Sequence, residues 1–221
     1  MKTKFIVMGQ PRSGTTAVRT SLNNHSQIHC AYEILNPLYN DHKQFTFDQV
    51  KSRISNLSKA EAKLVGFHFN FDTNFSHQVS AIKDWAQKVV IVNRPNQFDR
   101  YLSMYFAKRY GHWHNWMGNK YNKEKQKIPD EVNLDVKSVV DFVQKNTKLN
   151  NNMIRWAKEY DHCIVNYDDF CKMPGKALRE IQSFLGVPFE RIQPETTKFK
   201  KRSKIANKEE CLQALDDLLV T

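Results

Sequence analysis

The sequence has 221 residues, the length of one domain of about 100–200 residues with a small appendage. Hydrophobic residues make up 40% and charged residues 26% of the chain, and this ordinary globular composition excludes a disordered or collagen-like protein. Lysine and arginine together number 34 against 23 acidic residues, and the formal charge of +11 predicts an anionic partner: nucleic acid, a membrane surface, or a small phosphorylated or sulfated ligand.

Strand-like and helix-like segments alternate along the chain. Short runs of β-branched or alternating apolar residues predict strands at Phe5–Met8, Lys63–Phe71, Lys88–Asn93 and His162–Tyr167. Helical periodicity predicts helices at Thr15–Asn23, Phe45–Leu57, His77–Gln87, Phe98–Tyr110, Val136–Tyr160, Pro174–Leu185 and Asn207–Val220. Three consecutive asparagines at 150–152 leave open a break in the long helix.

This alternation predicts an α/β fold with a parallel sheet flanked by helices on both faces, in one domain over residues 1–221. Ligands of such sheets bind beyond the carboxyl ends of the strands, so we expect the chemistry in the loops that follow the predicted strands. The polar, tryptophan-bearing segment 110–133 is too long for a simple connector, which indicates a functional loop or lid.

The first predicted strand runs into Gly9-Gln10-Pro11-Arg12-Ser13-Gly14-Thr15-Thr16, the frame of the nucleotide P-loop GxxxxGK[ST] with Thr15 in the lysine position. The two glycines let the backbone curl around an anion, toward which the following amides would point from a helix N-terminus. Absence of the lysine argues against triphosphate chemistry. Arg12 supplies positive charge instead and can bind a tetrahedral anion through two parallel hydrogen bonds, so the loop suits a single phosphate or phosphosulfate.

Residues 11–16 resemble the 5′-phosphosulfate loop of sulfotransferases that use 3′-phosphoadenosine 5′-phosphosulfate (PAPS). Four later segments resemble further motifs of that family in the same order: 92–103, 164–170, 178–188 and 198–207. The resemblance, which is greatest to bacterial and viral carbohydrate-type members, implies a P-loop-like, sulfotransferase-type fold. It also implies PAPS as co-substrate, no metal, and a hydroxyl-bearing acceptor, with a sugar expected.

The resemblance assigns cofactor binding to two motifs and a basic loop. Arg94 at a strand end and Ser103 on the next helix would bind the 3′-phosphate, although their spacing of nine departs from the eight of many members; Arg100 is the substitute for Arg94. The basic loop 198–207 would cover the cofactor. The predicted cofactor-binding residues are Pro11, Arg12, Ser13, Gly14, Thr15, Thr16, Arg94, Ser103, Lys201 and Arg202.

Sulfuryl transfer also needs a base for the acceptor hydroxyl, and two residues are candidates beside Arg12, which would carry negative charge. Glu33 lies in a segment similar to that of bacterial carbohydrate sulfotransferases, where the glutamate serves as base, and the resemblance favours it. His68 lies on a predicted strand comparable to the one that carries the catalytic histidine of cytosolic small-molecule sulfotransferases. A histidine that alternates with phenylalanines is also typical of a packed structural residue.

Two other functions are weighed against sulfuryl transfer: a P-loop kinase-like nucleotide phosphotransferase, and a basic nucleic-acid-binding module. Thr15 argues against the first, and the absence of a nucleic-acid-binding signature argues against the second. No apolar run approaches the about 20 residues of a membrane helix, and residues 5–8 are too short for a secretory signal, which predicts a cytoplasmic protein. Four cysteines without a CxxC pair are expected to be reduced and to bind no metal.

Overall fold

The computed structural model describes residues 2–36, 45–57, 60–71, 76–111, 127–194 and 203–220. The chain divides into two compact units, the first formed by Met1–Pro95 with Asn150–Thr196 and the second by Asn96–Leu149 with Thr197–Thr221. Most of the predicted acceptor loop 110–133 and the start of the basic loop 198–207, with Lys201 and Arg202, lie outside the described residues.

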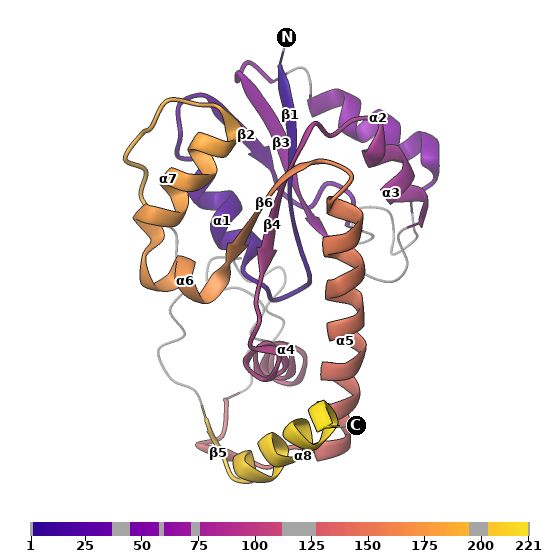
Figure 1. Ribbon diagram of the computed structural model, residues 1–221, viewed down its shortest axis with the longest axis vertical. Helices are drawn as coiled ribbons and strands as arrows, with labels where there is room; N and C mark the ends of the chain where they lie inside the picture. The colour runs from indigo at the N-terminus through magenta and orange to yellow at the C-terminus, as the bar shows by residue number, and fades with distance from the viewer. Residues whose placement is uncertain are drawn as a thin grey trace. The chain divides into compact units, whose positions relative to one another are not determined.

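The first unit is built on a five-stranded parallel sheet (Figure 1). This confirms the predicted α/β fold. The strand order is β2-β3-β1-β4-β6, so consecutive strands of the chain are not always neighbours in the sheet. The strands are β1 Thr3–Gly9, β2 Ile28–Ala31, β3 Leu64–Asn70, β4 Lys88–Asn93 and β6 Asp161–Asn166. Of these five strands, only β2, four residues long, has no counterpart among the predicted strands.

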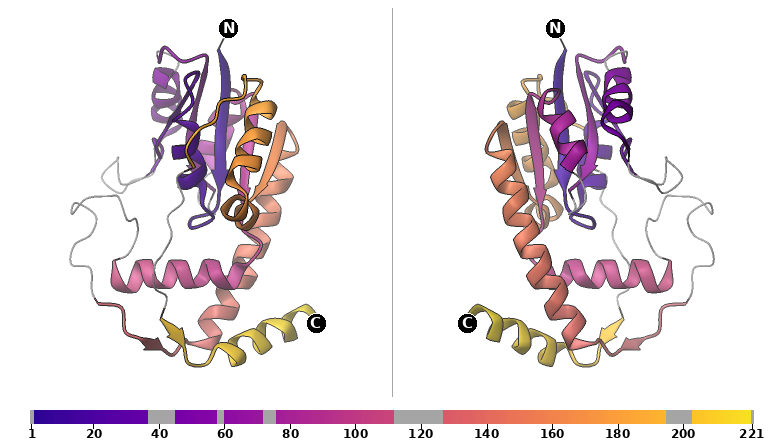
Figure 2. Two further views of the ribbon diagram at one scale, coloured as in Figure 1. Left: turned by 90° about the vertical axis from the view of Figure 1, so that its left-hand side faces the viewer. Right: turned by 90° about the vertical axis from the view of Figure 1, so that its right-hand side faces the viewer.

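Helices cover both faces of this sheet (Figures 1 and 2). On one face, β1 and β4 pack alternate side chains such as Val7 and Val90 against Val18 of α1 and Ile181 of α7. The other face meets α2 and α3, and the intervening strand residues are buried there, which is why the strands are almost continuously apolar. The helices are α1 Thr15–Leu22, α2 Phe47–Leu57, α3 Ser76–Lys83, α6 Tyr167–Lys172 and α7 Pro174–Leu185.

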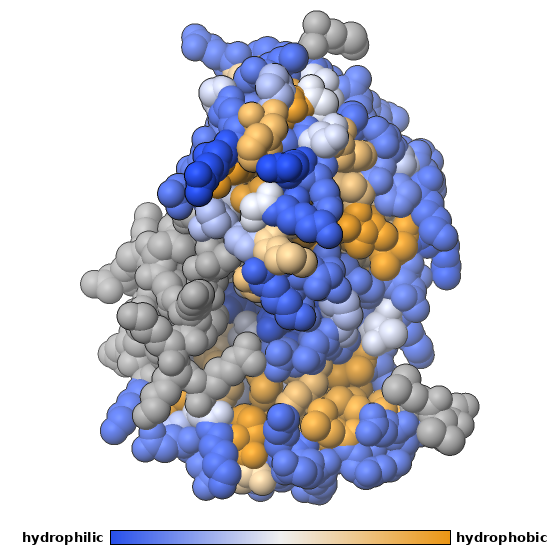
Figure 3. Space-filling model, turned by 60° about the vertical axis from the view of Figure 1, so that its left-hand side comes forward, coloured by the Kyte–Doolittle hydropathy of each residue, from blue (hydrophilic) through white to orange (hydrophobic). Residues whose placement is uncertain are grey.

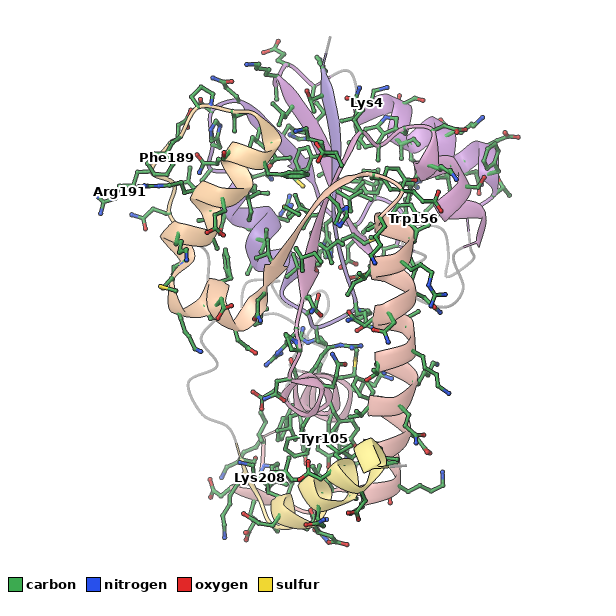
Figure 4. All side chains as sticks on the ribbon, in the orientation of Figure 1. Lys4, Tyr105, Trp156, Phe189, Arg191 and Lys208 are labelled. Carbon is green, nitrogen blue, oxygen red and sulfur yellow. The ribbon has the colours of Figure 1, made fainter. Side chains whose placement is uncertain are left out.

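The long helix α5, Val136–Ala157, runs without a break through the three asparagines and contributes to both units. In the first unit, Trp156 near its end packs beside Phe71, with ring centroids 6.5 Å apart (Figure 4). Across the face shown in Figure 3, hydrophilic side chains predominate and apolar ones form smaller patches. Among the described residues, no helix has both the length and the apolar character needed to cross a bilayer.

The second unit contains α4 Gln97–Tyr110, β5 Glu131–Val132, the first part of α5, β7 Lys204–Ile205 and α8 Lys208–Val220. Aromatic rings of α4 fill its core: Tyr101 stacks on Tyr105, which Figure 4 labels, at 6.2 Å. Arg100, only 1% exposed, donates to Gln97 Oε1 and Asn146 Oδ1 at 2.6 Å each. These bonds give Arg100 a structural role within this unit.

Candidate active site

The carboxyl ends of the strands of the first unit meet at one edge of the sheet. Gly9, the last residue of β1, pairs with Asn70 at the end of β3 and with Val92 in β4. Asn93 pairs with Asn166, so Arg94 and Tyr167 follow β4 and β6 at the same level. The segment that carries Glu33 follows β2, whose Ala31 pairs with Phe67 of β3. All the candidate residues of this unit therefore come from this edge or the residues next to it.

The loop between β1 and α1 has a backbone that only certain residues tolerate. Gly14 has φ +97°, and a Cβ there would lie 2.0 Å from the Tyr167 ring. A Cβ on Gly9 would lie 2.4 Å from Ser13 Oγ and 2.7 Å from the Val92 carbonyl oxygen. Both glycines of the predicted phosphate loop are thus required by packing, and Gly14 also by its left-handed conformation.

The start of α1 supplies backbone donors next to this loop. The first hydrogen bonds within the helix run from the amides of Ala17 and Val18 to the Gly14 carbonyl, so the amides of Thr15 and Thr16 precede them at the helix N-terminus. The Ser13 hydroxyl is buried and has no hydrogen-bond partner among the described residues. A buried hydroxyl at the mouth of an amide-lined loop is a donor suited to a phosphate or sulfate oxygen.

Two arginines meet at this loop. Arg94 is only 7% exposed, donates from Nη1 to the Arg12 carbonyl at 3.3 Å, and holds its guanidinium 5.3 Å from the centre of the Tyr167 ring. Burial, and to a lesser degree the charge of Arg94, lowers the pKa of Arg12, while Tyr167 opposes the shift. Burial raises the pKa of Tyr167 to about 12, so its phenol is neutral near pH 7. An anion bound here would relieve both the desolvation and the mutual repulsion of two guanidinium groups.

A second cluster gathers around Glu33, whose side chain is 11% exposed. Its Oε1 accepts a hydrogen bond from Asn70 Nδ2 at 2.8 Å, and its Oε2 accepts one from Asn36 Nδ2. His68 Nε2 lies 3.1 Å from Asn70 Oδ1, and His68 Nδ1 lies 3.6 Å from Glu33 Oε1. The two candidate bases therefore belong to one cluster, which Asn70 links.

Tyr32 connects this cluster with α1 and with the phosphate loop. Its ring meets that of His68 edge to face at 5.8 Å, and the guanidinium of Arg19 lies 5.5 Å from its centre. Tyr32 also contributes to the electrostatic environment of Arg12. Burial lowers the pKa of His68, an effect that Glu33 and Asn70 oppose and Arg19 reinforces. The cluster is thus a largely dehydrated acid–base site next to a cationic loop.

The sequence profile of the sulfotransferase domain family matches residues 2–215. The chain belongs to this family. Sulfuryl transfer is the activity of the family, and it requires a donor and an acceptor. No curated protein matches the sequence.

Three solved sulfotransferase structures share the fold over most of this chain. The sulfotransferase from Alicyclobacillus acidocaldarius is 13% identical, with a TM-score of 0.64 over 100% of this chain and 92% of that one. The sulfotransferase domain from the curacin biosynthetic pathway is 13% identical, with a TM-score of 0.52 over 95% and 86%. Mouse sulfotransferase SULT7A1, solved with PAP, is 15% identical, with a TM-score of 0.51 over 86% and 61%. At these identities the likeness concerns the fold alone.

The predicted site residues of this sulfotransferase fall into three groups. Residues 11–16 and Arg94 lie together at the phosphate loop, and Glu33 lies with His68. Ser103 lies on α4 in the second unit, so its part in cofactor binding stays a prediction from the sequence. The roles of Lys201 and Arg202 also stay predictions. Among the described residues, no three histidine, cysteine or acidic side chains could together hold a metal ion.

Sequence reasoning did not assign a role to Asn70, Asn36 or Tyr32. Asn70 stands two residues after His68, on the same face of β3 and at the end of the strand. This position in the sequence is the feature that could have indicated a place for Asn70 in the site. Asn36 and Tyr32 flank Glu33 within the segment that the resemblance singled out. Their contacts depend on how β2 and β3 pair, which the sequence does not state.

Proposed function

We propose that the protein transfers a sulfuryl group from PAPS to the hydroxyl group of an acceptor, which we expect to be a carbohydrate. The observation that carries the proposal is the phosphate loop itself. Two glycines at positions where a Cβ would clash and a left-handed Arg12 shape it, and Arg94 donates to its backbone. A threonine stands where an NTPase needs lysine. Family membership then favours sulfuryl transfer over the kinase-like and nucleic-acid-binding alternatives.

The residues present fit the phosphosulfate end of PAPS. The guanidinium of Arg12, the amides at the start of α1 and the buried Ser13 hydroxyl are donors for the 5′-phosphosulfate. We assign the 3′-phosphate to Arg94 and Ser103, and we retain Lys201 and Arg202 as proposed cofactor contacts. PAPS would supply the activated sulfuryl group, and no metal is needed to neutralise charge where arginines are present. The PAP bound to the mouse structure supports this donor by analogy.

Glu33 is the residue to which we assign the role of base. Amide donors hold both oxygens of its carboxylate in place, and its side chain, unlike that of His68, keeps some exposure from which an acceptor can approach. As the acceptor oxygen forms its bond to sulfur, Glu33 takes the hydroxyl proton. The S–O bond to the 5′-phosphate breaks with its electron pair left on the phosphate oxygen, where Arg12 and the loop amides stabilise the charge.

The proposal extends to the class of acceptor and to the cellular location. The carbohydrate assignment rests on the similarity around Glu33 and on aromatic residues at Trp113 and Trp116, which lie outside the described residues. Rings of that kind could stack on a sugar. We also propose that the protein works in the cytoplasm.

Ligand-induced thermal shifts test the donor assignment. The melting temperature should rise with 3′,5′-phosphoadenosine and much less with ATP, 5′-AMP or duplex DNA, because only the first carries the 3′-phosphate that the site is proposed to read. A larger shift with ATP or DNA would overturn the proposal. Transfer of radiolabel from PAPS to a panel of sugars, phenols and alcohols would then identify the acceptor class.

A further inference from the structure

The hydrogen bonds around Asn70 fix which nitrogen of His68 carries a proton. Asn70 donates from Nδ2 to Glu33 Oε1 at 2.8 Å, so its other terminal atom, Oδ1, faces His68 Nε2 at 3.1 Å. A carbonyl oxygen can only accept, so Nε2 carries the hydrogen. In the neutral imidazole Nδ1 is then a bare acceptor.

That bare nitrogen points at the carboxylate. His68 Nδ1 lies 3.6 Å from Glu33 Oε1, is buried, and has no hydrogen-bond partner among the described residues. An ionised carboxylate is also only an acceptor, so two acceptors face each other. The side chain of His68 is 1% exposed and that of Glu33 is 11% exposed, so little water can reach them. These two acceptor atoms can form a hydrogen bond with each other only when one of them carries a proton.

The surroundings decide when that proton is present. Burial lowers the pKa of His68, and Arg19 on α1 acts in the same direction, whereas Glu33 and Asn70 raise it. The rings of Tyr32 and His68 meet edge to face, with their centroids 5.8 Å apart. The His68 imidazole is therefore neutral near pH 7, and the proton that would complete its contact with Glu33 is the one that Glu33 takes from the acceptor.

From this geometry we infer that Glu33 and His68 form a proton relay, in which Glu33 takes the proton of the acceptor hydroxyl and His68 Nδ1 receives it from Glu33 Oε1. The inference rests on the proposed function of Glu33. The acceptor O–H bond breaks and its proton joins the carboxylate; that proton then moves to Nδ1 and leaves an imidazolium beside a restored carboxylate. His68 acts through Glu33 and does not touch the acceptor.

The first test is an NMR titration of imidazole ¹⁵N shifts, which needs no sulfuryl transfer. The His68 signals are identified by their absence in His68→Gln. At pH 8 the wild type should show a protonated Nε2 and an unprotonated Nδ1, and in Glu33→Gln the protonation of His68 should move to lower pH because the carboxylate no longer stabilises the imidazolium. A protonated Nδ1 at pH 8, or identical titrations in the two proteins, would overturn the relay.

The second test is the pH profile of kcat in His68→Gln. Glutamine can still donate to Asn70 Oδ1 but has no basic nitrogen, so kcat should fall by less than the about 10²–10⁴-fold loss of the base itself, with the affinity for 3′,5′-phosphoadenosine unchanged. Because only Glu33 would then have to be deprotonated, the acid limb of the profile should move to lower pH. A merely structural histidine would lower kcat without moving that limb, and such a result would refute the relay.

The two tests separate the relay from the proposed function. If no PAPS-dependent transfer is found, the NMR titration still reports whether Glu33 and His68 share a proton. If Glu33→Gln retains activity while His68→Gln is inactive, the proposed base is wrong and the relay falls with it. The matched control is His29→Gln on β2, an exposed histidine whose replacement should leave both readouts unchanged.

Discussion

The phosphate loop and the Glu33 cluster are two parts of one sheet edge that are built in different ways. The loop after β1 presents guanidinium groups, backbone amides and a hydroxyl, and its shape is set by two glycines and Tyr167. The cluster after β2 and β3 presents a carboxylate held by side-chain amides. One region accommodates negative charge and the other removes a proton. The difference suggests that donor binding and proton removal can be disabled separately.

The largest expected effect comes from the carboxylate. Glu33→Gln keeps the shape of the side chain but cannot take a proton, so kcat should fall about 10²–10⁴-fold. The affinity for 3′,5′-phosphoadenosine, measured by calorimetry, should stay within about twofold, since the loop is unaffected. Glu61→Gln, an exposed glutamate of the same unit, is the control. An active Glu33→Gln enzyme would show that Glu33 is not the base.

Arg12→Ala should lower both turnover and cofactor affinity. Loss of the guanidinium removes a donor from the leaving phosphate, so kcat should fall about 10²–10³-fold. In contrast to Glu33→Gln, cofactor affinity should fall as well, because the same group binds the ground state. Turnover and calorimetry together distinguish the two variants, with the exposed Arg179→Ala as control. A selective loss of kcat with full affinity would mean that Arg12 does not bind the donor.

Smaller effects should separate the two ends of the nucleotide. Arg94→Ala should weaken binding of 3′,5′-phosphoadenosine about 10–100-fold, the usual range for a hydrogen bond to a charged group, and binding of 5′-AMP much less. Ser103→Ala, which removes a neutral donor, should cost about 2–10-fold with the same selectivity. Competition binding of the two nucleotides measures both. Equal losses of affinity for the two ligands would show that these residues do not bind the 3′-phosphate.

The smallest expected effect is on stability. Burial lowers the pKa of His68 from its ordinary 6.5. Below about pH 6.5 this imidazole is therefore protonated more readily in the unfolded chain than in the folded protein. This contribution to the free energy of unfolding is present above pH 6.5 and lost as the pH falls, up to about 1 kcal/mol at pH 5.5. Denaturant titrations at pH 7.5 and 5.5 should show a smaller pH difference for His68→Gln than for the wild type or His29→Gln. Equal differences in all three would show that His68 is readily protonated when folded.

The same two regions show why one part of the site could be predicted from the sequence and the other only in outline. The phosphate loop is local: a strand, eight consecutive residues and a helix start contain its glycines and its arginine, and Gly9 and Gly14 stand where packing requires them. The four longer strands and most of the helices were similarly apparent from periodicity, although α5 continues through Asn150 where a break was left open, and the six-residue helix α6 was not predicted.

The Glu33 cluster depends on contacts between distant segments. Glu33 and Asn70 are 37 residues apart and meet because β2 pairs with β3, and β2 has only four residues with one exposed side chain, too weak a pattern to predict. The short strands β5 and β7 were missed because two residues carry no periodicity. The sequence therefore identified both candidate bases but not the amide that joins them. Nor did it show that Arg100 is a buried structural residue of the second unit.

Position 12 illustrates a conflict between heat resistance and catalysis. Arg12 is the one residue other than glycine with a positive φ among those described, at 69°, and this left-handed conformation costs a non-glycine residue about 1–2 kcal/mol. Glycine would adopt the same angle without strain, so Arg12→Gly should melt at a higher temperature than Arg12→Ala. Neither variant would carry the guanidinium. Laboratory evolution for thermal tolerance alone would thus tend to replace the arginine, and only concurrent selection for turnover would keep it.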